Sequence, residues 1–510
     1  MNLLKSFISV SFMTLISRIL GFIRDILIAS IFGVSVYTDA FFISFKIPNL
    51  LRRISESALA QCFTPVFIEY KITKSKIYMQ NFIASISGCI IFVLLLIIIF
   101  GSFFAQYIIN ITAPGFSKQS DQLILSSNLL IIMFPYVLLI SLSSLYTSIL
   151  NSWSYFCIPA LSPIFLNISL IIFSIFFSSF FDPSIIALSW AVIVGGFIQL
   201  FYQLPFLYKI NMLVIPKINF YHVGLIRVAK KMGLAILGIS ANQISLVINT
   251  IFASLLSSGS ISWIYYADRL IEFPVGILGV SLSTILFTPL TKYFKKRFNL
   301  KYERLLNWGI RIGLLLSMPS ALMLFFLAKP IIIVLFQYGK FTEFDVLMTV
   351  QVLKLYSFGL IAFILVKILT LAFYAQEEMN IPIKLSLLTL ILVQLINPIS
   401  IFYFKHAGLA LSLSISSWIN FLLLYWKLQK KNIINFKFDE FIFLIHVIIA
   451  TLIMSLILIS LLKIMPFWSI GSFLYKIIRL CFIMIMSSFG YLLTLHVLGV
   501  RWLNFYYQTV

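Results

Sequence analysis

Residues 17–70 read SRILGFIRDILIASIFGVSVYTDAFFISFKIPNLLRRISESALAQCFTPVFIEY, and this stretch decides the fold. It is apolar enough to cross a membrane twice, yet it carries charges along its whole length: Arg18, Arg24, Asp25, Asp39, Lys46, Arg52, Arg53 and Glu56. A charge at the centre of a spanning helix costs about 2.5–3.5 kcal/mol. Arg18, Arg24 and Arg52 would together cost about 8–10 kcal/mol in lipid. We therefore expect these three to face a water-filled cavity or a bound anion.

Helical spacing places polar residues of this stretch on two faces: Ser17, Arg18, Gly21, Arg24 and Asp25 on the first helix, and Asn49, Arg52 and Glu56 on the second. Each charged side chain could instead pair with an opposite charge or extend to the lipid headgroups, as we expect of Lys46, Arg53 and Asp25. The three other arginines outnumber the nearby acids. Guanidinium groups also suit the two parallel hydrogen bonds that a phosphate accepts.

The composition is that of a polytopic membrane protein. Of the 510 residues, 61% are hydrophobic and only 10% are charged, and no polar stretch is long enough to form a soluble domain. The net charge of +22 comes from 37 Lys and Arg against 15 Asp and Glu. Much of this excess lies in short loops, which sets membrane orientation and does not indicate a nucleic-acid partner.

Cysteine and histidine give no sign of a metal site, a disulfide or a cofactor. Cys62, Cys89, Cys157 and Cys481 are far apart in apolar runs, and the four histidines are isolated. The N-terminal apolar run contains Arg18 and Arg24 and lacks a cleavage site, so we do not expect a cleaved signal peptide.

The apolar runs predict about fourteen transmembrane helices. They lie near residues 7–32, 37–66, 81–106, 122–150, 158–180, 185–207, 232–256, 262–290, 307–330, 346–374, 381–403, 407–427, 441–463 and 474–498. Loops after even-numbered spans are generally rich in Lys and Arg, with the loop after span ten as an exception. The positive-inside rule then places both termini in the cytoplasm.

An internal repeat divides these spans into two copies of six. Ile158-Pro159 matches Ile381-Pro382, and Ala187-Leu188-Ser189 matches Ala410-Leu411-Ser412, with the same offset along the chain in both matches. An even number of spans keeps both copies in one orientation, and transporters of this build bind substrate between their halves. We expect an all-α protein with three parts: a lobe over 1–217, a lobe over 218–433 around a central cavity, and two further helices over 434–510.

The second copy repeats the polar face of the first. In residues 258–279, SGSISWIYYADRLIEFPVGILG, helical spacing aligns Ser262, Arg269 and Glu272 with Tyr266 or Tyr265. A pair between Arg269 and Glu272, or another acid, is the alternative to a role in binding. Pro48 and Pro274 are expected to interrupt spans two and eight, either as gating bends or as static kinks. Lys367 is a further buried cation, facing either the cavity or the headgroups.

The segments SRILGFIRD, TDAFFISFKIPNLLRR and TPVFIEY resemble the MurJ (MviN) family, whose members are lipid II flippases of bacterial peptidoglycan synthesis in the multidrug and polysaccharide exporter superfamily. The resemblance extends over essentially the whole chain, and Glu56-Ser57 departs from the Glu-Gly usual in the family. It implies that Arg18, Arg24, Asp39, Arg52 and Arg269 line the central cavity. We add Ser262 and Glu272 from their spacing. It also implies that the last two spans form a hydrophobic groove into the cavity.

The resemblance implies a multi-pass protein of the bacterial cytoplasmic membrane that flips lipid II by alternating access, the arginines binding its pyrophosphate. Its expected partners are lipid II, membrane lipids and cell-wall synthesis or division proteins.

Several alternatives stay open beside this expectation. Another lipid-linked oligosaccharide would need the same basic cavity, whereas a multidrug antiporter would want an acidic one. An enzyme acting on polyprenyl pyrophosphates would need acid-base or metal groups, which the few scattered acids do not provide. A scaffold would leave the buried arginines unexplained.

Overall fold

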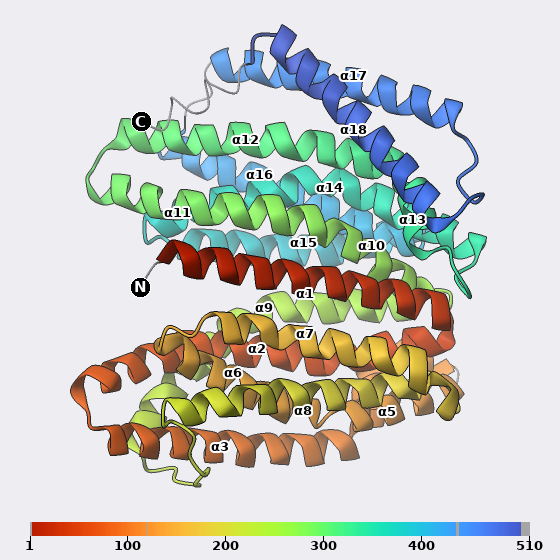
Figure 1. The fold of residues 1–510 in the computed structure, drawn as a ribbon. Coiled ribbons are helices and arrows are strands. Elements are labelled where there is room, and N and C mark those ends of the chain that lie inside the picture. The colour runs from red at the N-terminus through yellow and green to blue at the C-terminus, as the bar shows by residue number, and fades with distance from the viewer. Residues whose placement is uncertain (1–2, 119, 435–437, 501–510) are drawn as a thin grey trace. The chain divides into compact units, whose positions relative to one another are not determined.

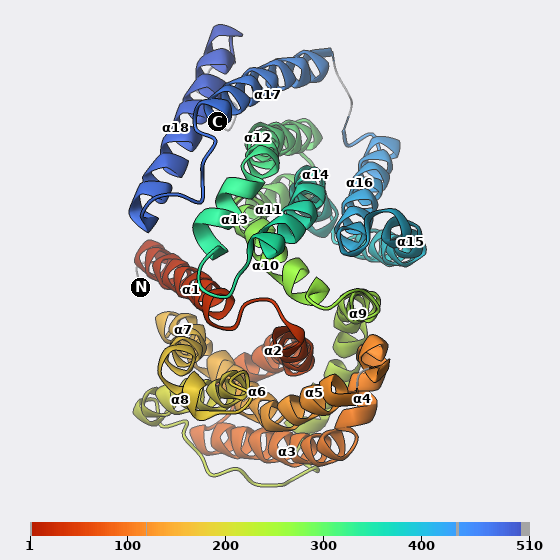
Figure 2. The same ribbon diagram turned by 90° about the vertical axis from the view of Figure 1, so that its right-hand side faces the viewer.

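The computed structural model describes residues 3–118, 120–434 and 438–500, and every regular element in these ranges is a helix (Figures 1 and 2). The all-helical prediction is confirmed. The chain forms two compact units, Met1–Ser262 and Trp263–Val510. Eleven helices in the described ranges are long and apolar enough to cross a membrane. Three more long helices, of 30, 38 and 32 residues, are α1, α2 and α9. The count of fourteen stays a prediction.

The first unit contains α1 (Leu3–Phe32), α2 (Val36–Thr73), α3 (Lys76–Phe103), α4 (Ala105–Thr112), η1 (Pro114–Lys118), α5 (Ser120–Met133), α6 (Tyr136–Ser152), α7 (Cys157–Ile172), η2 (Phe173–Phe177), η3 (Ser178–Phe180), α8 (Ile186–Lys209) and α9 (Val223–Ser254). Helix α6 packs against α2, α3 and α8, and α1 packs against α7. The C-terminal half of α2 packs against the start of α3 through Phe63, Phe67 and Phe82. These three side chains are fully buried, and their stacked rings have centroids 5.0–6.5 Å apart. This aromatic core fixes the helix that carries Arg52.

The second unit contains most of α10 (Ser260–Pro274), then η4 (Val275–Gly279), α11 (Val280–Lys295), α12 (Asn299–Phe326), α13 (Ala328–Phe336), α14 (Glu343–Ala375), α15 (Asn380–Phe404), α16 (His406–Lys430), α17 (Phe438–Ile464) and α18 (Phe473–Val497). Helix α14 lies between α12 and α16 (Figure 2). The two additional C-terminal helices attach to α12 through polar contacts. Arg311 of α12 pairs with Glu440 of α17 at 2.9 Å, and the hydroxyl of Tyr491 donates to the Leu315 carbonyl at 2.8 Å.

Helix boundaries confirm the internal repeat. Helix α12 begins and ends at the positions that α3 would occupy if shifted by the offset between Ile158 and Ile381. The same shift places the start of α5 at the start of α14 and the end of α6 at the end of α14. It also places the start of α4 at the start of α13, and the start of α7 at the start of α15. Helix α9 opens the second copy in sequence, but its contacts are with α2, α3, α4 and η1 of the first unit. The lobe boundary between residues 217 and 218 was inferred from the repeat and stays a prediction. It differs from the boundary between the two compact units, which follows Ser262.

The prolines differ in their effect on the helices that contain them. Pro48 does not end its helix, because α2 continues as α-helix from Val36 to Thr73. At Pro274, in contrast, α10 ends in the five-residue π-helical segment η4. The predicted single span near 122–150 is two helices that join at Phe134 and Pro135. A proline lacks the amide hydrogen that would continue the ladder of hydrogen bonds, which accounts for the last of these breaks.

Candidate functional site

Arg24 lies in a closed cluster between α1 and α7. Its Nε and Nη2 donate to Asp25 Oδ1 at 2.9 and 2.7 Å, and its Nη1 donates to Asn167 Oδ1 at 2.9 Å. Arg24 is 5% exposed and Asp25 is 0% exposed. Asn167 also donates to the Ser17 carbonyl, and its amide lies beside Gly21. Sequence reasoning missed Asn167, although a lone amide within the apolar run of α7 was a readable signal.

Arg18 stands two turns earlier on α1 in a different environment. Its side chain is exposed, and it forms no ion pair with any residue that the structure describes. Of the three arginines predicted to face water or an anion in this unit, Arg18 is therefore the one whose charge is uncompensated.

Arg52 forms the half-exposed cluster predicted from helical spacing. Its Nη1 donates to both carboxylate oxygens of Glu56 at 2.8 and 2.9 Å, and its Nε donates to Asn49 Oδ1 at 2.9 Å. The Arg52 and Glu56 side chains are 26% and 41% exposed. The charges of Arg24 and Arg52 both act on the Tyr136 hydroxyl of α6. Both arginines therefore lie on the side of the first unit that contains Tyr136.

Asp39 and Ser262 contact each other at a helix terminus. Asp39 Oδ2 accepts from the Gly259 amide at 2.6 Å, and its Oδ1 accepts from the amide and the hydroxyl of Ser262 at 2.9 and 2.6 Å. Asp39 is 1% and Ser262 is 0% exposed. A carboxylate at the N-terminus of a helix satisfies unpaired amides and complements the helix dipole. Asp39 thus fastens the start of α2 to the start of α10.

Arg269 of the second unit, like Arg52 of the first, is paired with a glutamate on its own helix. Its Nη1 donates to Glu272 at 3.0 Å, with the two side chains 35% and 58% exposed, and its guanidinium lies 5.6 Å from the centre of the Tyr265 ring. The alternative of an Arg269–Glu272 pair describes the observed contact. Lys367 of α14 reaches the Val275 carbonyl at 3.5 Å, beside η4. Among the described residues, no group of three or more His, Cys, Asp or Glu could hold a metal ion.

The fold defines the class: this is a polytopic helical membrane protein built as a tandem repeat, with arginines on the first helices of each copy. A solved inward-facing multidrug resistance transporter of the MATE family and MOP superfamily has the same fold, with a TM-score of 0.65 at 12% identity over 81% of this chain and 94% of that one.

The chain belongs to the MurJ family. The family described as "Lipid II flippase MurJ" matches residues 28–479. The "Probable lipid II flippase MurJ" of Buchnera aphidicola subsp. Acyrthosiphon pisum is 66% identical over 509 residues, with 100% of both chains covered. The "Lipid II flippase MurJ" of Burkholderia cenocepacia is 40% identical and covers 85% of each chain. A solved structure named "Lipid II flippase MurJ, inward closed conformation" superposes with a TM-score of 0.78 at 28% identity, over 94% of this chain and 98% of that one.

Proposed function

We propose that this protein moves lipid II across the bacterial cytoplasmic membrane by alternating access, and that its arginines bind the pyrophosphate. The observation that carries the proposal is Arg18, which is exposed and forms no ion pair in the described part of the chain, on the same helix as the Arg24 cluster. A pyrophosphate would neutralise such a site and offset the repulsion among its cations. Binding would then shift the conformational equilibrium through its different contacts in the two states.

The proposed roles divide by exposure. Arg18, Arg52 and Arg269 would contact the phosphates, because their guanidinium groups are exposed or paired with half-exposed carboxylates that an anion can displace. Glu56 and Glu272 would hold Arg52 and Arg269 in place between transport cycles. Arg24, Asp39 and Ser262 would act by position, since their polar atoms are buried against each other or against neighbouring helices.

Orientation and partners complete the proposal. The last turn of α11 and the loop that follows it are basic, with Lys292, Lys295, Lys296 and Arg297. The positive-inside rule would place this segment and both termini in the cytoplasm. Lipid II would enter from that leaflet with its polyprenyl chain in lipid. Cell-wall synthesis or division proteins are expected as partners. The proposed activity is movement without a chemical change, needing no metal or cofactor.

The test is depletion of the protein in its bacterium, with lipid II labelled separately on each membrane face. We expect depletion to trap lipid II on the cytoplasmic face and wild type to release it. Arg18→Ala, Arg52→Ala and Arg269→Ala should not release it. Arg53→Ala, which removes an exposed cation beside Arg52, is the matched control and should behave as wild type.

Three outcomes would overturn the proposal. Normal crossing of lipid II without the protein would reject the substrate and direct the same assay to other lipid-linked oligosaccharides. Release by the three alanine variants at the wild-type rate would reject the arginine site. Chemically altered lipid II recovered after incubation with the purified protein would instead indicate an enzyme.

A further inference from the structure

The start of α18 carries two cations that no acid compensates. Lys476 and Arg479 lie one turn apart on this helix, close to its first residue, Phe473, and α13 packs beside it (Figure 1). The connecting segments 337–342 and 465–472 border the start of the helix and contain no Asp or Glu. Neither cation forms an ion pair within the described ranges.

Lys476 is buried although it is charged. Only 7% of this residue is exposed. Its ammonium group makes no hydrogen bond with any residue that the structure describes, and it lies 5.4 Å from the centre of the Tyr338 ring. Lysine is rarely buried without a paired acid, and the dipole of a helix disfavours a cation in its first turn. An anion bound here would remove both penalties.

Two further groups beside Lys476 lack hydrogen-bond partners. The Tyr338 hydroxyl and the Arg479 Nε are enclosed by protein and form no hydrogen bond with any described residue. Arg479 Nη1 donates to the Phe467 carbonyl at 2.5 Å, and the guanidinium lies over the buried Trp468 ring, 4.4 Å from its centre. These contacts fix the guanidinium in place. Both unpaired groups can donate a hydrogen bond, so the missing partner is an acceptor.

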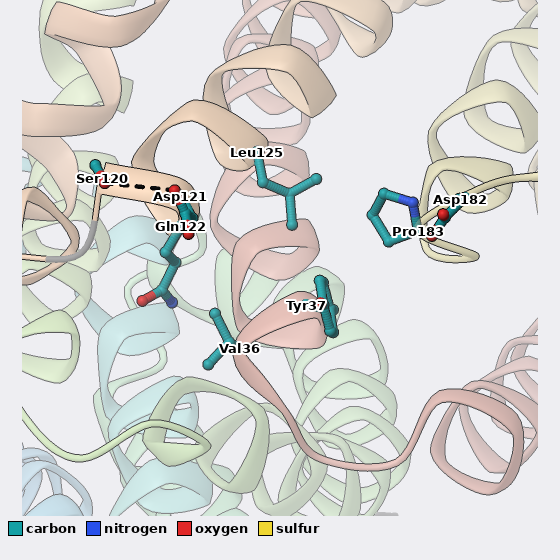
Figure 3. A pocket seen from close by; sticks show the side chains of 8 residues that line it. All are labelled: Val36, Tyr37, Ser120, Asp121, Gln122, Leu125, Asp182 and Pro183. Atoms are coloured by element: carbon teal, nitrogen blue, oxygen red, sulfur yellow. Dashed lines mark hydrogen bonds between the residues drawn. The ribbon is translucent and has the colours of Figure 1, made fainter.

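The cavity at the starts of α2 and α5 shows the opposite chemistry. Asp121 and Asp182 line it, and no Lys or Arg is among its described lining residues (Figure 3). Such a cavity would repel a phosphate. The cations of α18 are therefore particular to that helix, since an excess of basic residues over the whole chain does not produce them at every helix end.

We propose that the start of α18 binds the phosphate group of a membrane lipid. Lys476 and Arg479 would supply the positive charge, the guanidinium through hydrogen bonds to phosphate oxygens, and the Tyr338 hydroxyl would donate a further bond. The side chains of Leu474 and Ile478 on the same helix are apolar and 66% and 59% exposed. They would contact the hydrocarbon chain of the ligand, which favours a lipid over a free anion.

The loop order indicates the leaflet from which this lipid comes. Segments 337–342 and 465–472 follow predicted odd-numbered spans, opposite the Lys- and Arg-rich loops. The lipid would therefore bind from the leaflet that faces away from the basic loops. An anionic phospholipid and a polyprenyl pyrophosphate share the chemistry that the site requires.

The test is calorimetric titration of lipids into the full-length protein in dodecyl maltoside, a detergent without phosphate. Dioctanoyl phosphatidylglycerol and farnesyl pyrophosphate represent the two sources. We expect saturable binding of at least one of them by wild type. Lys476→Met or Arg479→Gln should each weaken it about tenfold, as for the loss of one hydrogen bond to a charged group. Tyr338→Phe should have a smaller effect.

Two control variants keep this site apart from other cations. Lys405→Gln removes an exposed cation at another connection on the same predicted side and should not change affinity. Arg18→Ala removes a cation of the proposed transport site and should leave binding of phosphatidylglycerol unchanged. Failure of the transport site and failure of the α18 site are therefore distinguishable.

Melting temperatures without ligand separate binding from a structural role. Lys476→Met removes a buried cation that has no counter-charge and should melt at or above the wild-type temperature. A lower melting temperature together with wild-type affinity would mean that Lys476 stabilises the fold and does not bind. Equal affinity of wild type and the Lys476→Met/Arg479→Gln double variant for both lipids would overturn the site. Inorganic pyrophosphate that binds as tightly as both lipids would overturn the lipid assignment.

Discussion

Arg24 of the first unit and Arg269 of the second each form an ion pair with a nearby acid, but the two pairs differ in burial. Arg24 is 5% exposed and donates three hydrogen bonds to Asp25 and Asn167. Arg269 has a 35% exposed side chain, paired with a Glu272 that is 58% exposed. Both arginines have acidic partners, so pairing alone does not distinguish a structural charge from a functional one.

Burial decides how much stability is lost when one partner of an ion pair is removed, because it decides whether water can solvate the charge that remains. Truncation of a buried pair leaves an uncompensated charge without water and costs about 3–5 kcal/mol, whereas an exposed pair is worth about 0–1 kcal/mol. An exposed arginine can also exchange its carboxylate for a phosphate at little cost. We therefore expect buried clusters to govern stability and exposed ones to govern transport.

The largest effect is expected at Arg24. Arg24→Ala should lower the free energy of unfolding by about 3–5 kcal/mol, because Asp25, at 0% exposed, would keep its charge without the guanidinium. Thermal melting of the purified protein in detergent measures the change. A melting temperature equal to that of wild type would contradict the structural role of this cluster.

A double-mutant cycle sharpens the result. Arg24→Gln and Asp25→Asn should each destabilise the protein, and the double variant should lose less than the sum of the two, because neither charge is then left alone. Strict additivity would show that the two side chains are not coupled.

The next largest effect is expected at Asp39. Asp39→Ala removes three hydrogen bonds at the start of α10, and loss of a helix cap typically costs about 0.5–2 kcal/mol. Asp39→Asn keeps an acceptor for part of this set and should cost less. Hydrogen exchange of the Gly259 and Ser262 amides is the direct measurement. Unchanged protection in Asp39→Ala would refute the capping role.

A smaller effect on stability is expected at the exposed pairs. Arg52→Ala and Arg269→Ala should change the free energy of unfolding by less than about 1 kcal/mol while abolishing lipid II crossing. Crossing and melting temperature should be measured on the same preparations. If a variant loses lipid II crossing and also has a lower melting temperature, its arginine stabilises the fold as Arg24 does.

Much of this picture could be predicted from the sequence. The constant offset read from Ile158 and Ile381 returns in the helix boundaries, because both copies fold by the same local rules. The Arg52–Glu56 contact followed from helical spacing alone. Asp39 bonding Ser262, and Arg24 bonding Asn167, join residues that are distant in sequence. Only tertiary packing sets such contacts, and no local pattern encodes them.

An exposed pair outside the predicted spans extends the comparison to pH. Glu69 bonds Arg227 at 2.8 Å, and their side chains are 45% and 44% exposed. The guanidinium lowers the pKa of the Glu69 carboxyl below its ordinary value of 4.5. A carboxyl with a lower pKa in the folded state contributes stability above its ordinary pKa and loses that contribution as the pH falls through the folded value. Melting temperatures of wild type and Glu69→Gln should therefore differ slightly at about pH 6 and converge toward about pH 3. A constant difference would exclude this ionisation as the cause.

The smallest effect on stability, and the sharpest separation of the two roles, is expected at Arg18. Its side chain is exposed and forms no ion pair in the described part of the chain, so Arg18→Ala leaves no partner charge behind. We expect a melting temperature equal to that of wild type together with loss of lipid II crossing. Arg18→Lys keeps the charge but not the two parallel donors that grip a phosphate, and should restore crossing only in part. Full restoration by lysine would mean that the site needs positive charge alone. A destabilised Arg18→Ala would show that exposure does not separate the two classes of arginine.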